Sequence, residues 1–506
     1  MKTLHPFRLL LCALALLLGA FCSASTANAQ VQTYSGYDAI VNVATASPGT
    51  GTPKTYDVGV GTAYPTLGSF NWGQLGPGDT MNIHPGTYHE LILLTVRGTA
   101  AAPITIQGIP DAQGNLPVID GQNATQDAQF AYNYKVFGSI GCITTYQPAS
   151  LAKNGYKPGY LVIKNLELRN CYAGDEPVSS SGKYTTPPIV NTFTDYTGAV
   201  QQYHNVGAGF YGLTCDHITI EGCNIHGNGE GVFGAGQGGF DRYMAGIVLR
   251  NNNIWGNGNI NSFTEHNSYL ESQGVLYEGN HYGPERVGAA GSSLKDRSSG
   301  TIVRYNFIES SARILDMVES QNSVDAELLD PAYHTTLVYG NILAQDDPRC
   351  AYAIHYGGDQ GESAYYRKGT LYFHSNTCYS TVPQSAQYKS TWFDEASAGE
   401  SIDARNNIVD YAVPGGGAAP ELDLLRPYGV GYFGVNWISA SWHPCFSASP
   451  FTGVDAGMSN FIEGADPGFN GYPADVSLKA GSPALEVAGP LSGALSGYPV
   501  TGEYSP

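Results

Sequence analysis

Residues 247–257 read IVLRNNNIWGN, in which apolar residues hold every second position before a run of asparagines and a second short apolar stretch. Such alternation is typical of a β-strand, and asparagine tolerates the left-handed backbone of a tight turn. The pattern apolar-x-apolar-x-x-Asn-x-apolar therefore predicts a strand that ends in a sharp corner. It recurs at 161–168, 218–228, 275–282, 301–308, 337–343, 371–378 and 402–409.

The copies are spaced like the coils of a solenoid. Successive markers lie 26 to 36 residues apart, which is too short for a propeller blade and fits one coil of a parallel β-helix. Stacked asparagine amides can also hydrogen-bond from coil to coil. The alternative is a β-sandwich with coincidental asparagine turns. The markers are Ile225, Ile254, Tyr282, Ile308, Ile342, Cys378 and Val409.

The composition agrees with a folded solenoid. Only 13 % of the 506 residues are charged, against about 25 % in ordinary domains, and 42 % are hydrophobic. These values exclude a disordered chain, and the 64 glycines follow no collagen period. In a solenoid each repeat contacts only its neighbours, so a chain of this length need not divide into domains.

The chain is acidic, with 24 Lys and Arg against 43 Asp and Glu and a formal charge of -19. No basic run is present after the N-terminal segment, so we expect no nucleic-acid partner. An acidic surface is also unfavourable for an anionic polysaccharide, unless a local basic patch or bound cations reverse the field at the site.

The N-terminal 29 residues have the features of a signal peptide. Lys2 and Arg8 precede an apolar run at 9–21, and Ala-Asn-Ala at 27–29 offers a cleavage site. The run is too short for a membrane anchor. We expect a secreted or periplasmic protein with no membrane attachment after cleavage, and a monomer. Most of the seven remaining cysteines should be buried small apolar residues, with at most one or two disulfides.

The first coils identify a resemblance to a known family. The phrase Pro-Gly-Asp-Thr at 77–80, with His-Pro-Gly-Thr-Tyr at 84–88 and Ile-Thr-Ile-Gln-Gly at 104–108, resembles the start of the pectate-lyase-like superfamily of right-handed parallel β-helix proteins. The resemblance extends through most of the chain after the signal peptide. It implies an all-β fold, a right-handed parallel β-helix formed as a single-stranded solenoid with long loop insertions.

Two insertions and one closing segment are expected in the domain at 30–506. Residues 172–206 are rich in Ser, Thr, Tyr and Pro, and residues 411–460 are rich in Gly, Pro and aromatics. Loops of this length are usually functional or disordered, and their aromatic residues favour an ordered role. They would form walls of a groove or a cover over the end of the helix. Residues 411–506 are expected to be a loop-rich C-terminal closing segment.

A column of ionisable residues is predicted on a second strand of each coil. The aligned segments are NSYLE at 267–271, SSLKD at 292–296, RILDM at 313–317, YAIHY at 352–356 and TWFDE at 391–395. If Leu270, Leu294, Leu315, Ile354 and Phe393 face the interior, the next residues are Glu271, Lys295, Asp316, His355 and Asp394. These five would point outward at the coil spacing of about 4.8 Å.

Close ionisable groups of this kind are candidate acids and bases, because neighbouring charges and burial shift their pKa values. The alternative is that Lys295 forms a surface salt bridge with Glu271 or Asp316 and has no further role. His266 lies in Glu-His-Asn at 265–267, near the expected entrance of the same groove, or else pairs only with its neighbour.

The phrase Ser-Leu-Lys-Asp-Arg at 293–297 resembles the lysine-bearing coil of β-helix lyases that act on uronic-acid polymers. The resemblance implies β-elimination with Lys295 as the base and Arg297 nearby. An arginine is expected about one coil later, where this chain has Asp316, with Arg313 as a neighbouring candidate. His355 completes the candidate catalytic residues.

Elimination also requires the carboxylate of the uronate to be neutralised, which a cation or an arginine can do. Glu271, Asp316 and Glu319 could hold calcium through their oxygen atoms.

Two other functions use the same surface. Paired carboxylates, Asp316 with Asp394 or with Glu271, could hydrolyse a glycosidic bond as acid and base. A non-catalytic carbohydrate-binding or adhesin-like surface would instead use aromatic rings that stack on sugars. The candidate rings are Tyr269, Tyr277, Tyr282, Tyr356 and Trp392, of which Tyr269 and Trp392, with His266, are also the expected substrate contacts of an enzyme.

Overall fold

The computed structural model describes residues 52–127, 129–130, 139–147, 155–173, 191–238, 242–350, 352–383, 390–411, 413, 418–446 and 449–504. All of them belong to one compact unit, Ala46–Pro506. The expected signal peptide and the middle of the 172–206 insertion lie outside the described residues. No helix in the described part is both long and apolar enough to span a membrane.

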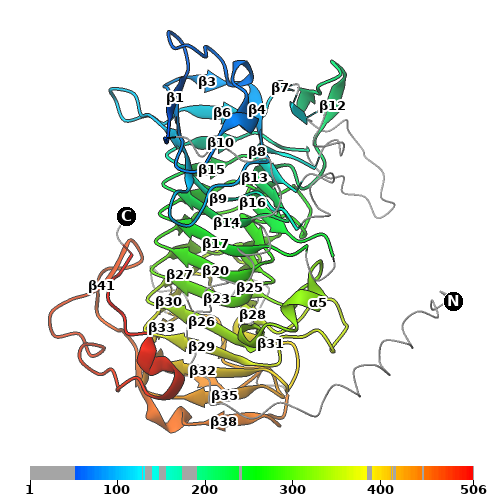
Figure 1. Cartoon of the computed structure of the whole chain (residues 1–506). Helices are drawn as coiled ribbons and strands as arrows, with labels where there is room; N and C mark the ends of the chain where they lie inside the picture. Colours follow the sequence, from blue (N-terminus) through cyan, green and yellow to red (C-terminus); the bar gives the residue numbers. More distant parts are fainter. Residues whose placement is uncertain are drawn as a thin grey trace, which may run out of the picture. The chain divides into compact units, whose positions relative to one another are not determined.

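Three sheets, almost entirely parallel, make up this unit (Figure 1). Sheet 1 contains, in spatial order, β1 (Thr55–Val58), β2 (Thr80–Ile83), β5 (Ile104–Gly108), β9 (Gly159–Lys164), β14 (Asp216–Glu221), β17 (Ala245–Arg250), β20 (Gln273–Glu278), β23 (Ser299–Arg304), β26 (Thr335–Tyr339), β29 (Thr370–His374), β32 (Ser401–Arg405), β35 (Val430–Phe433) and β38 (Val454–Ala456). Sheet 2 contains β3 (Thr87–Tyr88), β6 (Val118–Asp120), β10 (Glu167–Arg169), β15 (Asn224–His226), β18 (Asn253–Trp255), β21 (His281–Tyr282), β24 (Phe307–Glu309), β27 (Ile342–Gln345), β30 (Thr377–Ser380), β33 (Ile408–Asp410), β36 (Asn436–Ser439) and β39 (Phe461–Gly464).

Sheet 3 carries the candidate site. It contains β12 (Val200–Gln202), β11 (Thr192–Thr194), β7 (Ala124–Gln126), β4 (Glu90–Leu94), β8 (Gly141–Tyr146), β13 (Ala208–Leu213), β16 (Glu230–Ala235), β19 (Ser268–Leu270), β22 (Ser292–Asp296), β25 (Arg313–Met317), β28 (Tyr352–Tyr356), β31 (Ser390–Glu395), β34 (Leu422–Asp423) and β37 (Trp442–His443). Other described elements are the hairpin β40 (Phe469–Gly471) and β41 (Asp475–Leu478), the helix α5 (Val324–Glu327), and 3-10 turns at Leu67–Ser69, Trp72–Gln74, Pro331–His334, Met458–Asn460 and Gly493–Gly497.

The order of the strands confirms the parallel β-helix. From β14 to β39 the chain visits sheets 1, 2 and 3 in turn, and each strand pairs in parallel with the strand one coil earlier. Each coil therefore has three strands. The right-handed sense is the one that parallel β crossovers adopt in nearly all proteins.

The repeated phrase forms two strands and the corner between them. In IVLRNNNIWGN, β17 ends at Arg250, Asn251 adopts a left-handed backbone with φ 53°, and β18 begins at Asn253. Asn252, between them, donates its side-chain amide to Oδ1 of Asn280 in the next coil at 3.0 Å. Asn251 therefore forms the turn, and the adjacent Asn252 takes part in the ladder of stacked amides. The ladder continues through Asn306, Asn341, Asn376, Asn407 and Asn436 at 2.8–3.1 Å.

One marker of the repeat is displaced by a residue. Ile308 pairs with Leu343, and Leu343 pairs with Cys378, so the expected marker Ile342 is wrong. Both residues are apolar, and the pattern alone could not choose between them. Leu343 is buried, whereas Ile342 is only partly buried.

The interior of the coils is apolar, with cysteines among its small residues. The seven cysteines of the described residues are free and buried, in agreement with the expectation that most are small apolar residues. Tyr277, Tyr282 and Tyr356 are fully buried in the same core. Their expected role as an exposed sugar-binding surface is therefore wrong.

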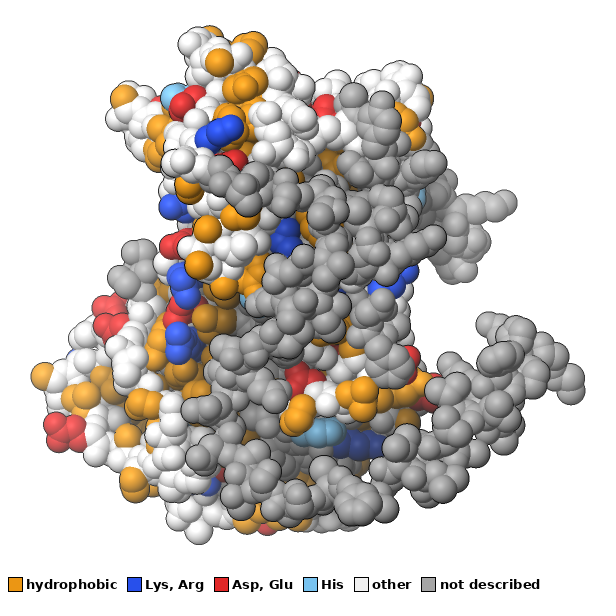
Figure 2. Space-filling view, viewed as in Figure 1, with side chains coloured by type: hydrophobic (Ala, Val, Ile, Leu, Met, Phe, Trp, Pro, Cys, Tyr) orange, Lys and Arg blue, Asp and Glu red, His pale blue; other side chains and the backbone are white. Residues whose placement is uncertain are grey.

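The coils continue into the expected closing segment. Strands β34 to β39 lie between residues 411 and 464 and extend all three sheets. Beyond them the chain returns along sheet 1, where Leu495 packs in a buried cluster with Leu337 and Tyr339. On the face in Figure 2, described Lys and Arg side chains lie apart from one another, some of them beside Asp or Glu.

Candidate active site

A row of in-register residues crosses sheet 3. Tyr269 pairs with Lys295, Lys295 with Asp316, Asp316 with His355, and His355 with Asp394. Four of the five residues predicted for the column therefore occupy it. Parallel pairing at about 4.8 Å between strands brings their side chains within contact distance.

The fifth prediction, Glu271, has the wrong register. Leu270 pairs with Asp296 rather than with Leu294, so Glu271 is displaced from the row by two residues. Leu294 and Asp296 lie on the same face of β22 and both are fully buried. An apolar pattern could not reveal that a buried aspartate, rather than a leucine, is the partner of Leu270.

Lys295 is held between two carboxylates. Its Nζ lies 2.7 Å from Oδ2 of Asp316 and 2.5 Å from Oδ2 of Asp359. The Lys295 side chain is 5 % exposed and that of Asp316 is 1 % exposed. The expected outward, solvent-facing column is therefore wrong in its exposure, because the loop that carries Asp359 lies against it.

Arg297 extends the same ionic network. Its Nη2 donates to Oδ1 and Oδ2 of Asp359 at 2.8 and 3.0 Å. Its Nη1 donates to the backbone oxygen of Glu319 at 2.7 Å and lies 3.4 Å from the carboxylate of the same residue. The guanidinium is 3 % exposed and also lies over the ring of Tyr269. Asp359 thus joins Lys295 and Arg297 through one carboxylate.

His355 is oriented by Asp316. Its Nδ1 lies 2.8 Å from Oδ1 of Asp316, which fixes Nδ1 as the donor to an ionised carboxylate. Its Nε2 has no hydrogen-bond partner among the described residues. The imidazole side chain is 9 % exposed. This is the relation of a base to its orienting carboxylate that nucleophilic and acid–base sites use.

Two cationic side chains and one imidazole converge on Asp316. Burial alone would raise the pKa of this carboxyl, but Lys295, His355 and Arg313 hold it well below its usual range. Nη1 of Arg313 lies 3.4 Å from Oδ2, and the hydroxyl of Ser292 donates to the same atom at 3.2 Å. Asp316 is therefore a fixed negative charge, and both of its oxygens accept hydrogen bonds.

Aromatic rings continue the row on the preceding coils. The rings of Tyr211 and Phe233 stack at 5.0 Å, and those of Phe233 and Tyr269 stack at 5.3 Å. Tyr269 also donates its hydroxyl to Gln321 at 3.0 Å. His266 stacks on Tyr269, and its Nδ1 accepts the backbone N–H of Ser292.

His266 is neutral in this environment. Burial, and then the charge of Lys295, lowers the pKa of His266 to about 3. It therefore supports β22 through a hydrogen bond and contributes no positive charge to the row.

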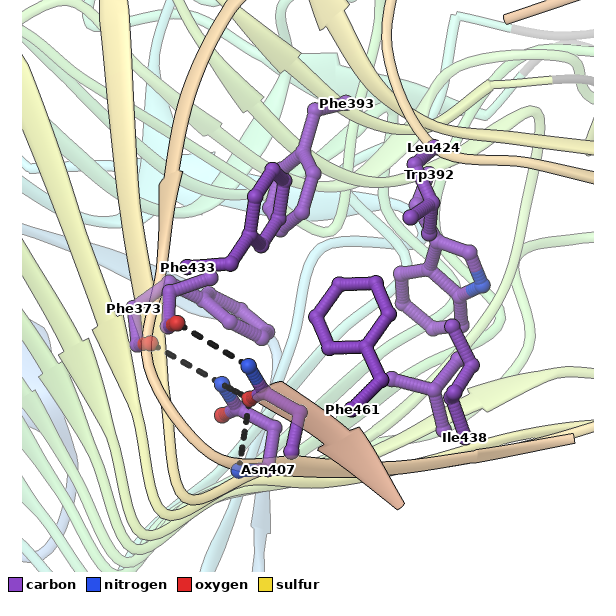
Figure 3. Close-up of a pocket in the computed structure, with 11 residues that line it drawn as sticks. Phe373, Trp392, Phe393, Asn407, Leu424, Phe433, Ile438 and Phe461 are labelled. Carbon is purple, nitrogen blue, oxygen red and sulfur yellow. Dashed lines mark hydrogen bonds between the residues drawn. The ribbon is translucent and has the colours of Figure 1, made fainter. Parts of the chain in front are cut away.

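Trp392 does not reach the candidate site. It is 1 % exposed and lines a small apolar cavity of about 20 Å³ inside the coils. Figure 3 shows Trp392, Phe393 and Phe461 pointing toward one another around that space. Its expected role as a substrate contact is therefore wrong.

Asp394, the last member of the row, forms an ion pair with Arg426. Arg426 in turn lies over the ring of Tyr352. This end of the row is thus a separate ion pair, and in the described part of the chain no hydrogen bond or ion pair joins the Asp394 side chain to Lys295 or Arg297.

The three carboxylates expected to hold calcium are not brought together. Glu271 accepts the hydroxyl of Ser320 and the backbone N–H of Asn322, while Glu319 accepts the N–H groups of Asp359 and Gln360 at 2.8 and 2.7 Å. Asp316 is surrounded by cations. These residues therefore do not fit a calcium site, because their oxygens already bind protein donors.

A set of metal-ligand types occurs elsewhere on sheet 3. Among the described residues, Glu421, Asp423 and His443 place potential ligand atoms within 4.8 Å of one another. Glu421 and His443 also line a pocket of about 660 Å³ that includes none of the Lys295 network. Acidic groups gathered near an imidazole are common without a bound metal.

Asp359, Gln360 and Ser292 are site residues that the sequence analysis missed. Asp359 lies in Gly-Gly-Asp-Gln-Gly at 357–361, between β28 and β29. An acidic residue flanked by glycines directly after a strand of the predicted column was the signal available. It was overlooked because only strand residues were aligned.

Comparisons with known proteins identify similar folds only. No family model and no curated protein matches the sequence. An alginate lyase from Paenibacillus sp. str. FPU-7 is 15 % identical, with 75 % of this chain and 98 % of that chain covered and a TM-score of 0.42. A GH136 lacto-N-biosidase from Eubacterium ramulus is 12 % identical, with 81 % and 68 % covered and a TM-score of 0.40. The pectate lyase Pel9A is 12 % identical, with 84 % and 85 % covered and a TM-score of 0.36.

These likenesses are too weak to assign chemistry to this chain. The strand order itself, with three parallel sheets visited once per coil, is that of a parallel β-helix. A fold of this kind supports many functions, so the function must be argued from the site.

Proposed function

We propose that this protein is a polysaccharide lyase that cleaves a uronate-containing polymer by β-elimination, with His355 as the base. The observation that carries the proposal is the position of Asp316, which pairs with Lys295 on one side and orients His355 on the other. The resemblance of residues 293–297 to the lysine-bearing coil of uronate lyases supports the same reaction.

The ion pairs favour His355 over Lys295 as the base. A base must present a free lone pair, whereas Nζ of Lys295 donates hydrogen bonds to two carboxylates at 2.7 and 2.5 Å. Nε2 of His355 carries a lone pair when Nδ1 is protonated toward Asp316. Lys295 and Arg297 are then suited to neutralise the substrate carboxylate, which the elimination needs.

The proposed reaction balances without an added cofactor. Nε2 of His355 takes the proton from C5 of the uronate, and the released electron pair forms the C4–C5 double bond while the bond from C4 to the glycosidic oxygen breaks. The imidazolium then returns a proton to that oxygen. The products are an unsaturated uronate and a free hydroxyl. Arg313, which lies beside Asp316 and is partly exposed, would stabilise charge on the leaving oxygen.

Hydrolysis by paired carboxylates fits the site less well. That reaction needs one carboxyl group to carry a proton as the general acid. The pKa of Asp316 is instead held well below its usual range by the cations around it, and both of its oxygens accept hydrogen bonds.

The leader expected at residues 1–29 would place the lyase outside the cytoplasm.

The proposal is tested by incubating the protein with a panel of uronate polymers and recording the absorbance at about 235 nm, where an unsaturated uronate absorbs. We expect an increase with one polymer and a loss of about 10²–10⁴-fold in His355→Gln. His281→Gln, on sheet 2 and paired with Glu309, is the matched control and should retain activity. New reducing ends without this absorbance, or full activity in His355→Gln, would refute the proposal.

A further inference from the structure

The carboxylate of Asp359 lies between two buried cations. Lys295 and Arg297 lie two residues apart at the end of β22, and their side chains are 5 % and 3 % exposed. Their charged groups converge on one carboxylate, with contacts at 2.5, 2.8 and 3.0 Å. Two buried cations around one planar carboxylate form the recognition pattern used for carboxylate ligands.

The carboxylate in this site belongs to a loop and not to the sheet. Asp359 lies in the turn after β28, and its side chain is 22 % exposed, so it is the member of this group nearest to solvent. The turn is bounded by Gly357 and Gly361, whose φ values of 119° and 78° are accessible mainly to glycine. Glu319 holds the same turn through the N–H groups of Asp359 and Gln360.

We infer that the carboxylate of Asp359 is a resident stand-in for the carboxylate of an acidic sugar, which displaces it from Lys295 and Arg297 when substrate binds. This inference rests on the proposed function and deepens it, because it assigns the substrate-carboxylate position to a named pair of cations. The depressed pKa of Asp359, about 2, agrees with a carboxylate that is fully ionised in this position.

Exchange of the Asp359 carboxylate for a substrate carboxylate keeps the buried cations neutralised both with and without substrate. Without Asp359, the buried Lys295 and Arg297 would face only Asp316 and Glu319, and the positive charge left uncompensated would be costly in an empty enzyme. A resident carboxylate removes that cost, and a substrate carboxylate can replace it with equal charge. The apparent affinity for substrate is then reduced by the fraction of molecules in which Asp359 occupies the pair.

The first test measures anion binding without turnover. Asp359→Ala should leave the pair open, so acetate should raise the thermal unfolding midpoint of this variant by several degrees while neutral acetamide does not. The wild-type protein, in which Asp359 fills the site, should respond little to acetate. Glu362→Ala is the matched control, because Glu362 is exposed on the same loop and its side chain makes no hydrogen bond or ion pair with any described residue.

The second test measures the competition during turnover. Asp359→Asn should lower KM for the cleaved uronate polymer about tenfold, and Glu362→Gln should leave KM unchanged. The inference would be overturned if KM rises in Asp359→Asn and if acetate shifts the unfolding midpoint of Asp359→Ala no more than that of the wild-type protein. Asp359 would then only hold the loop in place.

The two proposals can fail separately. Acetate binding by Asp359→Ala together with no cleavage of any uronate polymer would keep the anion site and remove the lyase. Cleavage by the wild-type protein together with an acetate response equal in all variants would keep the lyase and remove the resident carboxylate.

Discussion

Asp316 is the residue on which the site depends, because it is almost fully buried and joins two functional side chains. Asp316→Asn keeps the size of the side chain but removes the charge that Lys295 and His355 face. Breaking one partner of a buried ion pair costs about 3–5 kcal/mol. We therefore predict a loss of that size in the free energy of unfolding, measured in urea, and a loss of most activity.

The activity per folded molecule of Asp316→Asn shows whether Asp316 orients His355 or only stabilises the fold. An amide at position 316 can donate to Nδ1 of His355 and so favour the wrong tautomer of the imidazole. The folded fraction of Asp316→Asn at working temperature should therefore retain KM within a few-fold while kcat falls. A variant that is destabilised but equally active per folded molecule would contradict the role of Asp316 as the positioning residue for His355.

Glu395, next to the row on β31, predicts a pH dependence of stability. Burial raises the pKa of Glu395 to about 8, although it accepts the backbone N–H of Arg426. A raised pKa means that the folded state holds its proton more tightly, so this contribution is fully present below about pH 4.5 and lost as the pH rises through about 8.

The variant Glu395→Gln cannot titrate and should remove that loss. We expect wild-type stability in urea to fall relative to Glu395→Gln between about pH 5 and about pH 8, and the difference to level off above about pH 8. Equal slopes in the two proteins would mean that Glu395 is not protonated in the folded state.

At the scale of the elements, the asparagine ladder fixes the corners between sheets 1 and 2. Asn252 donates to Asn280 and to the backbone oxygen of Ile220, and it accepts the N–H of Cys223. Its replacement leaves these buried groups without partners, at about 1–3 kcal/mol. Asn252→Ala should therefore lower the free energy of unfolding by that amount.

The neighbouring asparagine provides a control in the same phrase. Asn253 is only partly buried, and its side chain makes no hydrogen bond to any described residue. Asn253→Ala should change stability by no more than about 0.5 kcal/mol. Equal effects of the two substitutions on the free energy of unfolding, measured in urea, would contradict the claim that Asn252 stabilises the corner through its hydrogen bonds and Asn253 does not.

The asparagine ladder and most of the ionisable row could be predicted from the sequence, because both follow from strand alternation and coil spacing. Lys295, Asp316, His355 and Asp394 were aligned through interior apolar residues that pair as expected. The prediction failed at Glu271 because Asp296 occupies an interior position. It binds the fully buried Arg367 at 2.7 Å, and an ion pair inside the coil leaves no apolar signal.

Burial of the row could not be predicted from the strands at all. Lys295 is covered through contacts with Asp359, which is 64 residues away in the chain. An exposed ladder of similar sequence pattern exists on sheet 1, where Arg250, Glu278 and Arg304 pair while the arginines remain 38 % and 31 % exposed. The difference between the two ladders lies in the loops and not in the strand residues.

At the scale of the whole molecule, the acidic charge of -19 opposes an anionic substrate until it reaches the local cations. Added salt screens this long-range repulsion more than it weakens contacts with the buried Lys295 and Arg297. We predict that kcat/KM for a long uronate polymer rises between about 10 mM and about 100 mM salt. A steady fall over that range would indicate an exposed basic surface as the binding site.

The central claim is that the chain breaks its substrate by elimination, and the masses of the products test it most directly. Mass spectrometry of a defined uronate oligosaccharide after cleavage should give two products whose masses add up to that of the substrate, because elimination adds no water. Products whose masses exceed that of the substrate by one water molecule would demonstrate hydrolysis and contradict the proposed role of His355.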